Sequence, residues 1–187
     1  MLTRTQAEDL FRPYHSAIRH AFVTAIQQYF EVHRSHLAKI HERTKASYIN
    51  DLIFRNLVDA LSSAPNVRTE EIRGQRRLWF GDAACVRLKK LDRNKRPKLN
   101  ASQMSFDFLY QATVQLTLPD MQPPTNLFIG YTLNTTRTAI NGVYIVCING
   151  DVFEWAPIEI LENAAVPTPV ALIPSVASPS GRVRVRQ

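Results

Sequence analysis

The sequence predicts an α+β fold in which two N-terminal helices pack on a mostly antiparallel sheet of about five strands, followed by a disordered C-terminal tail. Three observations support this fold class. Apolar residues recur every three or four positions up to about residue 61, which is typical of amphipathic helices. After Pro65 the apolar residues alternate with polar ones, as they do in half-buried strands. From Glu162 onward the composition shifts to Pro, Ala, Val and Ser, without a pattern that would bury one face.

The two helices follow from this spacing. The first is expected from Pro13, since proline is tolerated at a helix start, to about Ile40. HERTKAS then interrupts the pattern, and a second helix with Thr44 or Ser47 as candidate N-cap is expected to end before SSAPN. A helix-turn-helix that reads DNA needs shorter helices and a tight turn, so this pair is more typical of a core.

Five strands and a short helix are expected in the second half. The strand VRTEEIRGQRRLWF and the strand ACVRLKKL flank Gly81-Asp82, a suitable two-residue hairpin turn. A short helix is expected at 101–112, and the two prolines of PDMQPPT indicate a stiff linker. The last three strands are NLFIGYTL, VYIVCI and VFEWAPIEI, separated by a loop with Asn141-Gly142 and by Asn149-Gly150.

The helices and the sheet are expected to share one core. VYIVCI is apolar on both faces, which predicts a central strand that the N-terminal helices cover on one side. We therefore expect a single α+β domain over residues 1–162, helical in 1–64 and sheet-forming in 67–161. Residues 163–187 are expected to form a flexible, Pro-rich basic tail.

Composition argues against several classes of protein. No apolar run reaches the length of a membrane span and the N-terminus has no apolar signal-peptide core, so we expect a cytoplasmic protein without membrane contact. Cys85 and Cys147 lie in apolar, strand-like runs and are expected to be reduced core residues. His33, His36 and His41 lack accompanying ligands, so no metal site and no cofactor are expected.

Positive charge is concentrated in one segment. The net charge is +7, and eleven of the 23 lysines and arginines lie in residues 68–98, which contain only four acids. The rest of the chain is balanced. A protein with such a basic segment attracts polyanions whatever its fold.

The predicted hairpin brings arginines together. A two-residue turn pairs Phe80 with Ala83 and places Arg76 opposite Arg87, whereas a slip of one residue places Arg77 there. Like charges that face each other across a sheet are destabilising, so this arrangement indicates a bound anion, an acidic neighbour or simple solvent screening.

The basic segment is therefore a candidate nucleic-acid site. Phosphate contacts need only cations at suitable spacing, and Trp79 at the end of the hairpin is positioned to stack on a base. The alternative is that Trp79 lies in the core and the cations form a solvated face. The candidate phosphate contacts are Arg76, Arg77, Arg87, Lys89, Lys90, Arg93, Lys95, Arg96 and Lys98.

An enzymatic alternative has partial support. Asp82 and Lys89 occupy two of the places that metal-dependent, restriction-type nucleases fill on a strand pair. Such a site needs a second acid two positions before the lysine, where Arg87 repels a metal ion instead. We find no nucleophile motif and no Gly-rich phosphate loop in the sequence.

Three segments, RTKASYINDLI, VRLKKLDRNKRPKLNASQMSF and NGVYIVCINGDVFEW, resemble an uncharacterised group of bacterial proteins associated with prophages and other mobile elements. The resemblance covers about residues 40–160. It implies a regulatory or defence protein encoded near helix-turn-helix regulators or toxin–antitoxin genes, with no known reaction. The positions that it makes candidates, each with a structural alternative, are Arg43, Lys45, Asp51, Arg87, Lys89, Lys90 and Asp92.

We accordingly expect a nucleic-acid-binding or regulatory component of a bacterial mobile-element or toxin–antitoxin module, which binds DNA or RNA through the hairpin and loop at 68–98. Two alternatives remain open. One is a protein-interaction module whose cations meet an acidic partner such as an antitoxin, or a helix-turn-helix protein. The other is a nuclease-like toxin, intact or degenerate.

Overall fold

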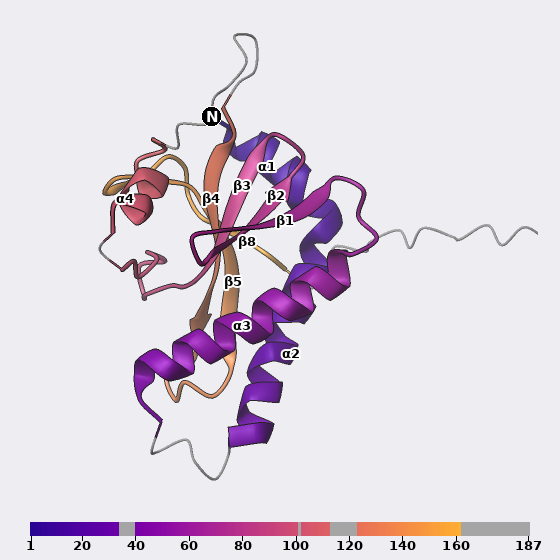
Figure 1. The fold of residues 1–187 in the computed structure, drawn as a ribbon, viewed down its shortest axis with the longest axis vertical. Coiled ribbons are helices and arrows are strands. Elements are labelled where there is room, and N and C mark those ends of the chain that lie inside the picture. The colour runs from indigo at the N-terminus through magenta and orange to yellow at the C-terminus, as the bar shows by residue number, and fades with distance from the viewer. Residues whose placement is uncertain (34–39, 101, 113–122, 162–187) are drawn as a thin grey trace, which may run out of the picture.

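The computed structural model describes residues 1–33, 40–100, 102–112 and 123–161. Its helices and strands follow each other along the chain as in Figure 1. The helices are α1 (Arg4–Phe11), the 3-10 helix η1 (Arg12–Tyr14), α2 (His15–His33), α3 (Glu42–Leu61) and α4 (Gln103–Leu109). The strands are β1 (Val67–Ile72), β2 (Gln75–Phe80), β3 (Ala84–Lys90), β4 (Thr125–Leu133), β5 (Ile140–Val146), β6 (Ile148–Asn149), β7 (Val152–Phe153) and β8 (Ile158–Glu159).

Six strands form one mixed sheet in the order β1-β2-β3-β4-β5-β8, and β6 pairs with β7 in a separate small hairpin. All neighbours in the large sheet are antiparallel except β3 and β4, which are parallel. A parallel pair needs a crossover connection, and α4 lies in the one between β3 and β4. The predicted α+β class, with N-terminal helices on a mostly antiparallel sheet, is confirmed. The predicted tail at 163–187 lies outside the described residues.

The two faces of the sheet carry separate cores. On one face the residues of α1, α2 and α3 pack against alternate residues of the strands, such as Leu78, Val86 and Ile129. On the other face Phe108 of α4 packs on the intervening residues, which include Cys85 and Phe128. In Figure 1, α2 and α3 lie on one side of the sheet and α4 on the other. β4 lies near the middle of the sheet and is buried over residues 125–131.

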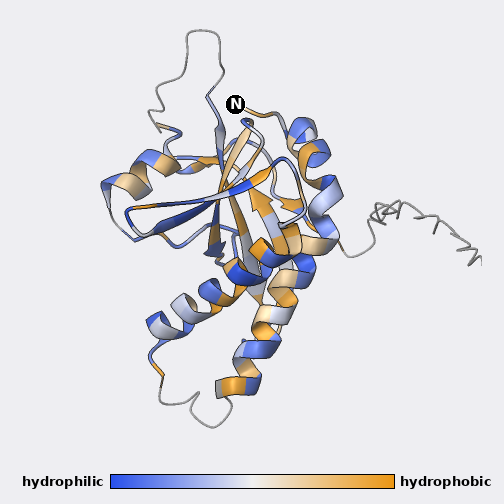
Figure 2. Ribbon diagram, turned by 45° about the vertical axis from the view of Figure 1, so that its right-hand side comes forward, coloured by the Kyte–Doolittle hydropathy of each residue, from blue (hydrophilic) through white to orange (hydrophobic). Residues whose placement is uncertain are grey.

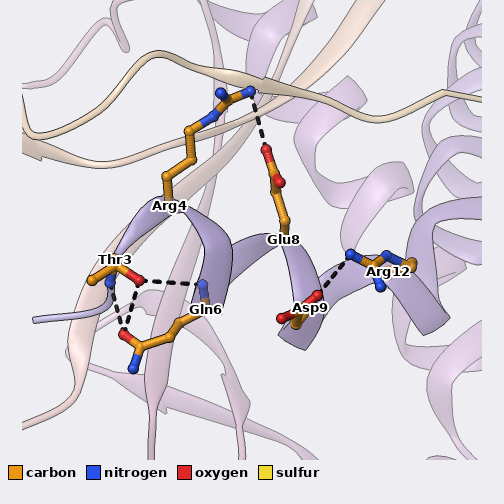
Figure 3. Close-up of polar contacts among 6 residues, drawn as sticks. All are labelled: Thr3, Arg4, Gln6, Glu8, Asp9 and Arg12. Carbon is orange, nitrogen blue, oxygen red and sulfur yellow. Dashed lines mark hydrogen bonds and ion pairs between the residues drawn. The ribbon is translucent and has the colours of Figure 1, made fainter.

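The N-terminal helices begin differently from the prediction. An additional helix, α1, starts at a capping box in which the side chains of Thr3 and Gln6 each accept a hydrogen bond from the other's backbone N–H (Figure 3). Ion pairs from Arg4 to Glu8 and from Arg12 to Asp9 follow along it (Figure 3). For α3, His41 is the N-cap instead of Thr44 or Ser47, because its Nδ1 accepts from the N–H of Arg43.

The β1–β2 hairpin corrects one predicted strand. VRTEEIRGQRRLWF forms two strands, because Arg73 and Gly74 both adopt positive φ values, 49° and 74°, and make a tight turn between them. The next loop has three residues, 81–83, so Phe80 pairs with Ala84 instead of Ala83. Figure 2 shows that the part of this hairpin next to its turn is mostly hydrophilic, with one hydrophobic position.

Two further elements differ. Asn141 and Gly142 belong to β5 beside an irregularity in its pairing with β4, and do not form the predicted loop. The segment VFEWAPIEI forms not one strand but β7 and β8, which belong to different sheets. Asn149-Gly150 forms the predicted hairpin turn, between β6 and β7. None of the helices in the described residues is both long and apolar enough to cross a membrane.

Both cysteines are free and buried, one in each core. Burial raises the pKa of Cys85 to about 11 and that of Cys147 to about 12. A thiol of the unfolded chain ionises near pH 8.5, so above that pH the unfolded state binds fewer protons and the free energy of unfolding falls.

We expect neither thiol to react with a thiol reagent at pH 8 until the chain is unfolded. Between pH 8.5 and 10 the wild type should lose about 1.6 kcal/mol more stability than a Cys147→Ala variant, because the loss per buried thiol rises toward about 1.4 kcal/mol per pH unit as the thiol of the unfolded chain ionises. Urea unfolding at the two pH values measures this difference. Equal losses in the two proteins would contradict it.

Candidate nucleic-acid interface

A cleft opens where β2 and β3 part. Their pairing ends at Leu78 and Val86, although both strands continue beyond it. The resulting cavity, called here the β2–β3 cleft, has a volume of about 410 Å³. Its walls come from α3, the β1–β2 hairpin, β3 and the segment that leads into α4. They include Asp51, Phe54, Glu71, Gln75, Arg76, Arg87, Lys89, Asn100, Ser102 and Ser105.

Two arginines on the α4 side of the sheet are buried next to this cleft. Arg77 and Arg87 are each only 6% exposed. Both guanidinium groups lie near the ring of Phe108, at 5.9 Å and 5.1 Å from its centroid. Nη1 of Arg87 and Nε of Arg77 are buried without a hydrogen-bond partner. Over the described residues, neither arginine forms an ion pair with a carboxylate.

The electrostatic consequence is a buried site with excess positive charge. Burial, and next the charge of Arg77, lower the pKa of Arg87 to about 10. Burial, and next the charge of Arg87, also lower the pKa of Lys89 below its usual value. Buried charges are normally paired, because taking an ion out of water costs several kcal/mol. Within the described part of the chain, the three side chains therefore form a site whose cations lack a counter-ion.

Arg76 has a different role, since alternation directs it to the opposite face of β2. Its Nη1 lies 2.6 Å from Oδ1 of Asp51 on α3, and its Nε lies 3.8 Å from Oε2 of Glu71 on β1. The guanidinium also lies over the ring of Phe54 at 5.2 Å. Two carboxylates thus already balance its charge, and Arg76 tethers the hairpin to α3.

A second cavity lies at the end of β3. This β3-end groove has a volume of about 580 Å³ and collects four cations, Lys90, Arg93, Lys98 and Arg137, together with Glu42 and Asp92. Lys90 is half-buried, and its pKa is lowered first by burial and next by Arg137. Arg93, Lys98 and Arg137 are exposed. Since Lys89 lines the cleft and Lys90 the groove, the two cavities flank the same strand end.

The loop after β3 is folded by its own polar residues. Oδ1 of Asp92 accepts hydrogen bonds from the backbone N–H groups of Asn94 and Arg96, at 2.8 and 2.9 Å. Lys95 lies 4.5 Å above the ring of Tyr144, and Arg96 lies over Phe153 and donates to the carbonyl oxygen of Asp151. These contacts favour a structural role for Asp92, Lys95 and Arg96.

Trp79 is not exposed for stacking on a base, as one of the two interpretations of this residue required. It is 4% exposed and packs in the core beneath α4. Its Nε1 donates to Oε2 of Glu70 at 2.9 Å, and the guanidinium of Arg68 lies 4.6 Å above its ring. Because Glu70 already accepts its hydrogen bond and Arg68 already covers its ring, Trp79 belongs to the core, as the alternative interpretation predicted.

The remaining candidates lie on α3. Asp51 lines the β2–β3 cleft and pairs with Arg76. Lys45 pairs with Glu42 at 3.0 Å, and Arg43 is exposed in the first turn.

Of the residues predicted to contact phosphate, Arg76, Arg87 and Lys89 line the cleft, with Arg77 beside Arg87, and Lys90, Arg93 and Lys98 line the groove. The register also explains the pair of arginines: continuing it from Leu78 and Val86 places Arg77 beside Arg87, the second of the two predicted arrangements.

Three residues of these cavities, Arg137, Asn100 and Ser102, were not predicted from the sequence. Arg137 comes from the β4–β5 loop, 47 positions after Lys90, where a single cation in a neutral segment gives no signal. Asn100 and Ser102 line the cleft beside the cations. Ser102 carries a recognisable signal as the N-cap of α4, but only for helix formation.

The nuclease arrangement considered as an alternative does not form. Asp82 lies in the loop before β3, whereas Lys89 lies near the far end of that strand, roughly 16 Å from Ala84 at about 3.3 Å per residue. In the described residues, no three His, Cys, Asp or Glu side chains are grouped to hold a metal ion. No protein-family model, curated protein or solved structure matches this chain.

Proposed function

We propose that this protein binds single-stranded nucleic acid at the end of β3, with backbone phosphates in the β2–β3 cleft and the β3-end groove. The observation that carries the proposal is that Arg87 lines the cleft together with Lys89, while its buried Nη1 lacks a hydrogen-bond partner. A guanidinium donor without a partner favours an anionic ligand, and phosphate is the anion that arginine binds in nucleic acids.

The shapes of the cavities favour a single strand over a duplex. The convex surface of a duplex reaches exposed cations such as Arg93 and Lys98, whereas a flexible single strand is able to enter a cleft and approach Arg87. Lys89 and Lys90 point to opposite faces of β3, so a strand that passes the end of β3 meets cations on both sides. The resemblance to mobile-element proteins is consistent with a role in regulation or defence, which remains part of the proposal.

A second candidate function is the binding of an acidic protein, such as an antitoxin. It is favoured by the exposure of Arg93, Lys98 and Arg137 around the groove, since a folded partner reaches these three cations but not Arg87. The two functions therefore depend on different residues.

The carboxylates in the cleft invite comparison with a nuclease. Asp51 and Glu71 line the cleft together with Lys89, which is the combination that a metal-dependent nuclease needs. However, Arg76 pairs with both acids, and Arg87 stands two positions before Lys89, where a metal-binding acid is required. We therefore propose binding without cleavage.

Fluorescence anisotropy with a labelled single-stranded oligonucleotide that has hydroxyl groups at both ends tests this function. The logarithm of affinity should fall with the logarithm of salt concentration, by about 0.7 per phosphate contact on a single strand. A Lys89→Ala/Lys90→Ala variant removes one cation from each cavity, so its slope should be smaller by up to about 1.4. The oligonucleotide should be recovered intact after incubation with Mg²⁺.

Arg12→Gln is the matched control, since Arg12 pairs with Asp9 on α1, near the end of the sheet where β3 begins. Its affinity and salt slope should equal those of the wild type. Absence of binding at low salt, or an unchanged slope in the double lysine variant, would overturn the proposal. Cleavage that is lost in a Lys89→Ala variant would establish the nuclease instead.

A further inference from the structure

We propose that the β2–β3 cleft binds the terminal phosphate monoester of a nucleic-acid strand, in preference to an internal phosphodiester. This inference rests on the proposed function and specifies the ligand group that the cleft accepts. An end-binding cleft would hold a strand by its phosphorylated end while the β3-end groove contacts internal phosphates.

Access to the buried cation is the first argument. Arg87 is 94% buried, and its unpartnered Nη1 lies inside the protein surface. An internal phosphodiester carries a nucleoside on each side, so it reaches such a donor only if both flanking nucleosides fit. A terminal phosphate carries one nucleoside and enters end-on. The volume of about 410 Å³ lies within the range of pockets for small ligands, which suits one terminal nucleotide.

Charge is the second argument. Arg77, Arg87 and Lys89 raise the local positive charge without a carboxylate partner in the described residues, and Arg77 and Arg87 repel each other. A phosphodiester contributes a single negative charge, whereas a phosphate monoester carries about −1.5 to −2 at pH 7 because its second pKa is near 6. The monoester also offers three terminal oxygens, enough for a bidentate contact with a guanidinium and a further contact with Lys89.

The residues that line the cleft determine from which side the nucleic-acid strand enters it. Asp51 and Glu71 stand on the wall formed by α3 and β1, where they pair with Arg76. Their charges disfavour the approach of a polyanion along that wall. Asn100 and Ser102 line the cleft from the segment that leads into α4, and both are exposed and uncharged. The amide of Asn100 is able to donate hydrogen bonds, whereas the hydroxyl of Ser102 already donates to Oγ of Ser105. The strand therefore enters beside these two residues.

The test compares oligonucleotides of one sequence that carry a phosphate at the 5′ end, at the 3′ end or at neither, with AMP and inorganic phosphate as competitors. We expect one of the phosphorylated strands to bind about tenfold more tightly than the unphosphorylated strand. The preference should decrease below pH 6, as the monoester takes up its second proton. An Arg87→Gln variant should lose the preference and still bind the unphosphorylated strand through the groove.

A second variant tests the same inference in case Arg87→Gln does not fold. Asn100→Asp places a negative charge at the exposed part of the cleft without changing a buried residue, and it should weaken the preference severalfold. Arg12→Gln should retain it. Equal binding of phosphorylated and unphosphorylated strands would overturn this inference and leave the proposed function standing. Binding of AMP or inorganic phosphate that requires Arg87, without binding of any strand, would preserve the monoester site and overturn the proposed function.

Discussion

Arg87→Met is expected to raise the free energy of unfolding by about 1–3 kcal/mol, the cost of a buried donor without a partner. The side chain is buried beside a second arginine, and no carboxylate of the described residues pairs with it. The lost cation–π contact with Phe108 costs about 0.5–2 kcal/mol, which is less than the several kcal/mol for burying an ion. Methionine is long, flexible and apolar, so it fills the space against the ring.

The gain in the free energy of unfolding from Arg87→Met should depend on pH in a defined direction. The pKa of Arg87 is about 10 in the folded protein, below its ordinary value, so folding disfavours the charged form. The penalty is fully present below the folded pKa and is relieved as the pH rises from about 10 toward the ordinary value near 12.5. The stability advantage of Arg87→Met should therefore be constant from pH 6 to 9 and decrease above pH 10.

Urea unfolding measures both effects, and Arg93→Met is the matched control. Arg93 is exposed in the loop after β3, so its replacement should change stability by less than about 0.5 kcal/mol. A loss of stability in Arg87→Met would mean that the guanidinium is stabilised within the folded chain. It would contradict the inference that Arg87 lacks a counter-ion that a bound anion supplies. In the wild type, an added phosphate ligand should raise the melting temperature, and in the variant it should not.

Phe108→Ala is expected to cost about 3–5 kcal/mol of stability, a large share of the roughly 5–15 kcal/mol that holds a typical domain together. Phe108 is 1% exposed and is the residue by which α4 closes the second core. Its ring lies 5.1 Å from that of Phe128 in an edge-to-face arrangement, and both buried arginines lie near it. Removal of the ring leaves a cavity and exposes two cations together.

Phe106→Ala is the control on the same helix. Phe106 is 46% exposed, so its truncation should cost less than about 1 kcal/mol. Urea unfolding should show a much lower midpoint for Phe108→Ala than for Phe106→Ala. Similar midpoints for the two variants would show that α4 contributes little to the fold, and the cleft would then lack a rigid wall.

Much of the fold follows from local pattern. The apolar spacing in α2 and α3 and the alternation in β3 identified these elements, because the spacing of residues along a helix or strand decides which side chains share a face. The turn at Arg73-Gly74 was missed, because the residues around it are polar apart from Ile72, so no change of pattern marks the turn and only the positive φ values divide the strand. β7 and β8 were merged for a similar reason: nothing in VFEWAPIEI indicates that its two ends join different sheets.

For the site, the sequence by itself determined that the cations are concentrated in residues 68–98 and that two arginines face each other near the hairpin. The tertiary structure decided which of these cations is buried, paired or exposed. Alternation places Arg77, Trp79 and Arg87 on one face of the sheet. Only the crossover between β3 and β4 brings Phe108 over that face, where its ring excludes water from the arginines. Contacts between residues far apart in the sequence decide which side chains are buried, and burial distinguishes the cations at the cleft from those that are exposed to solvent.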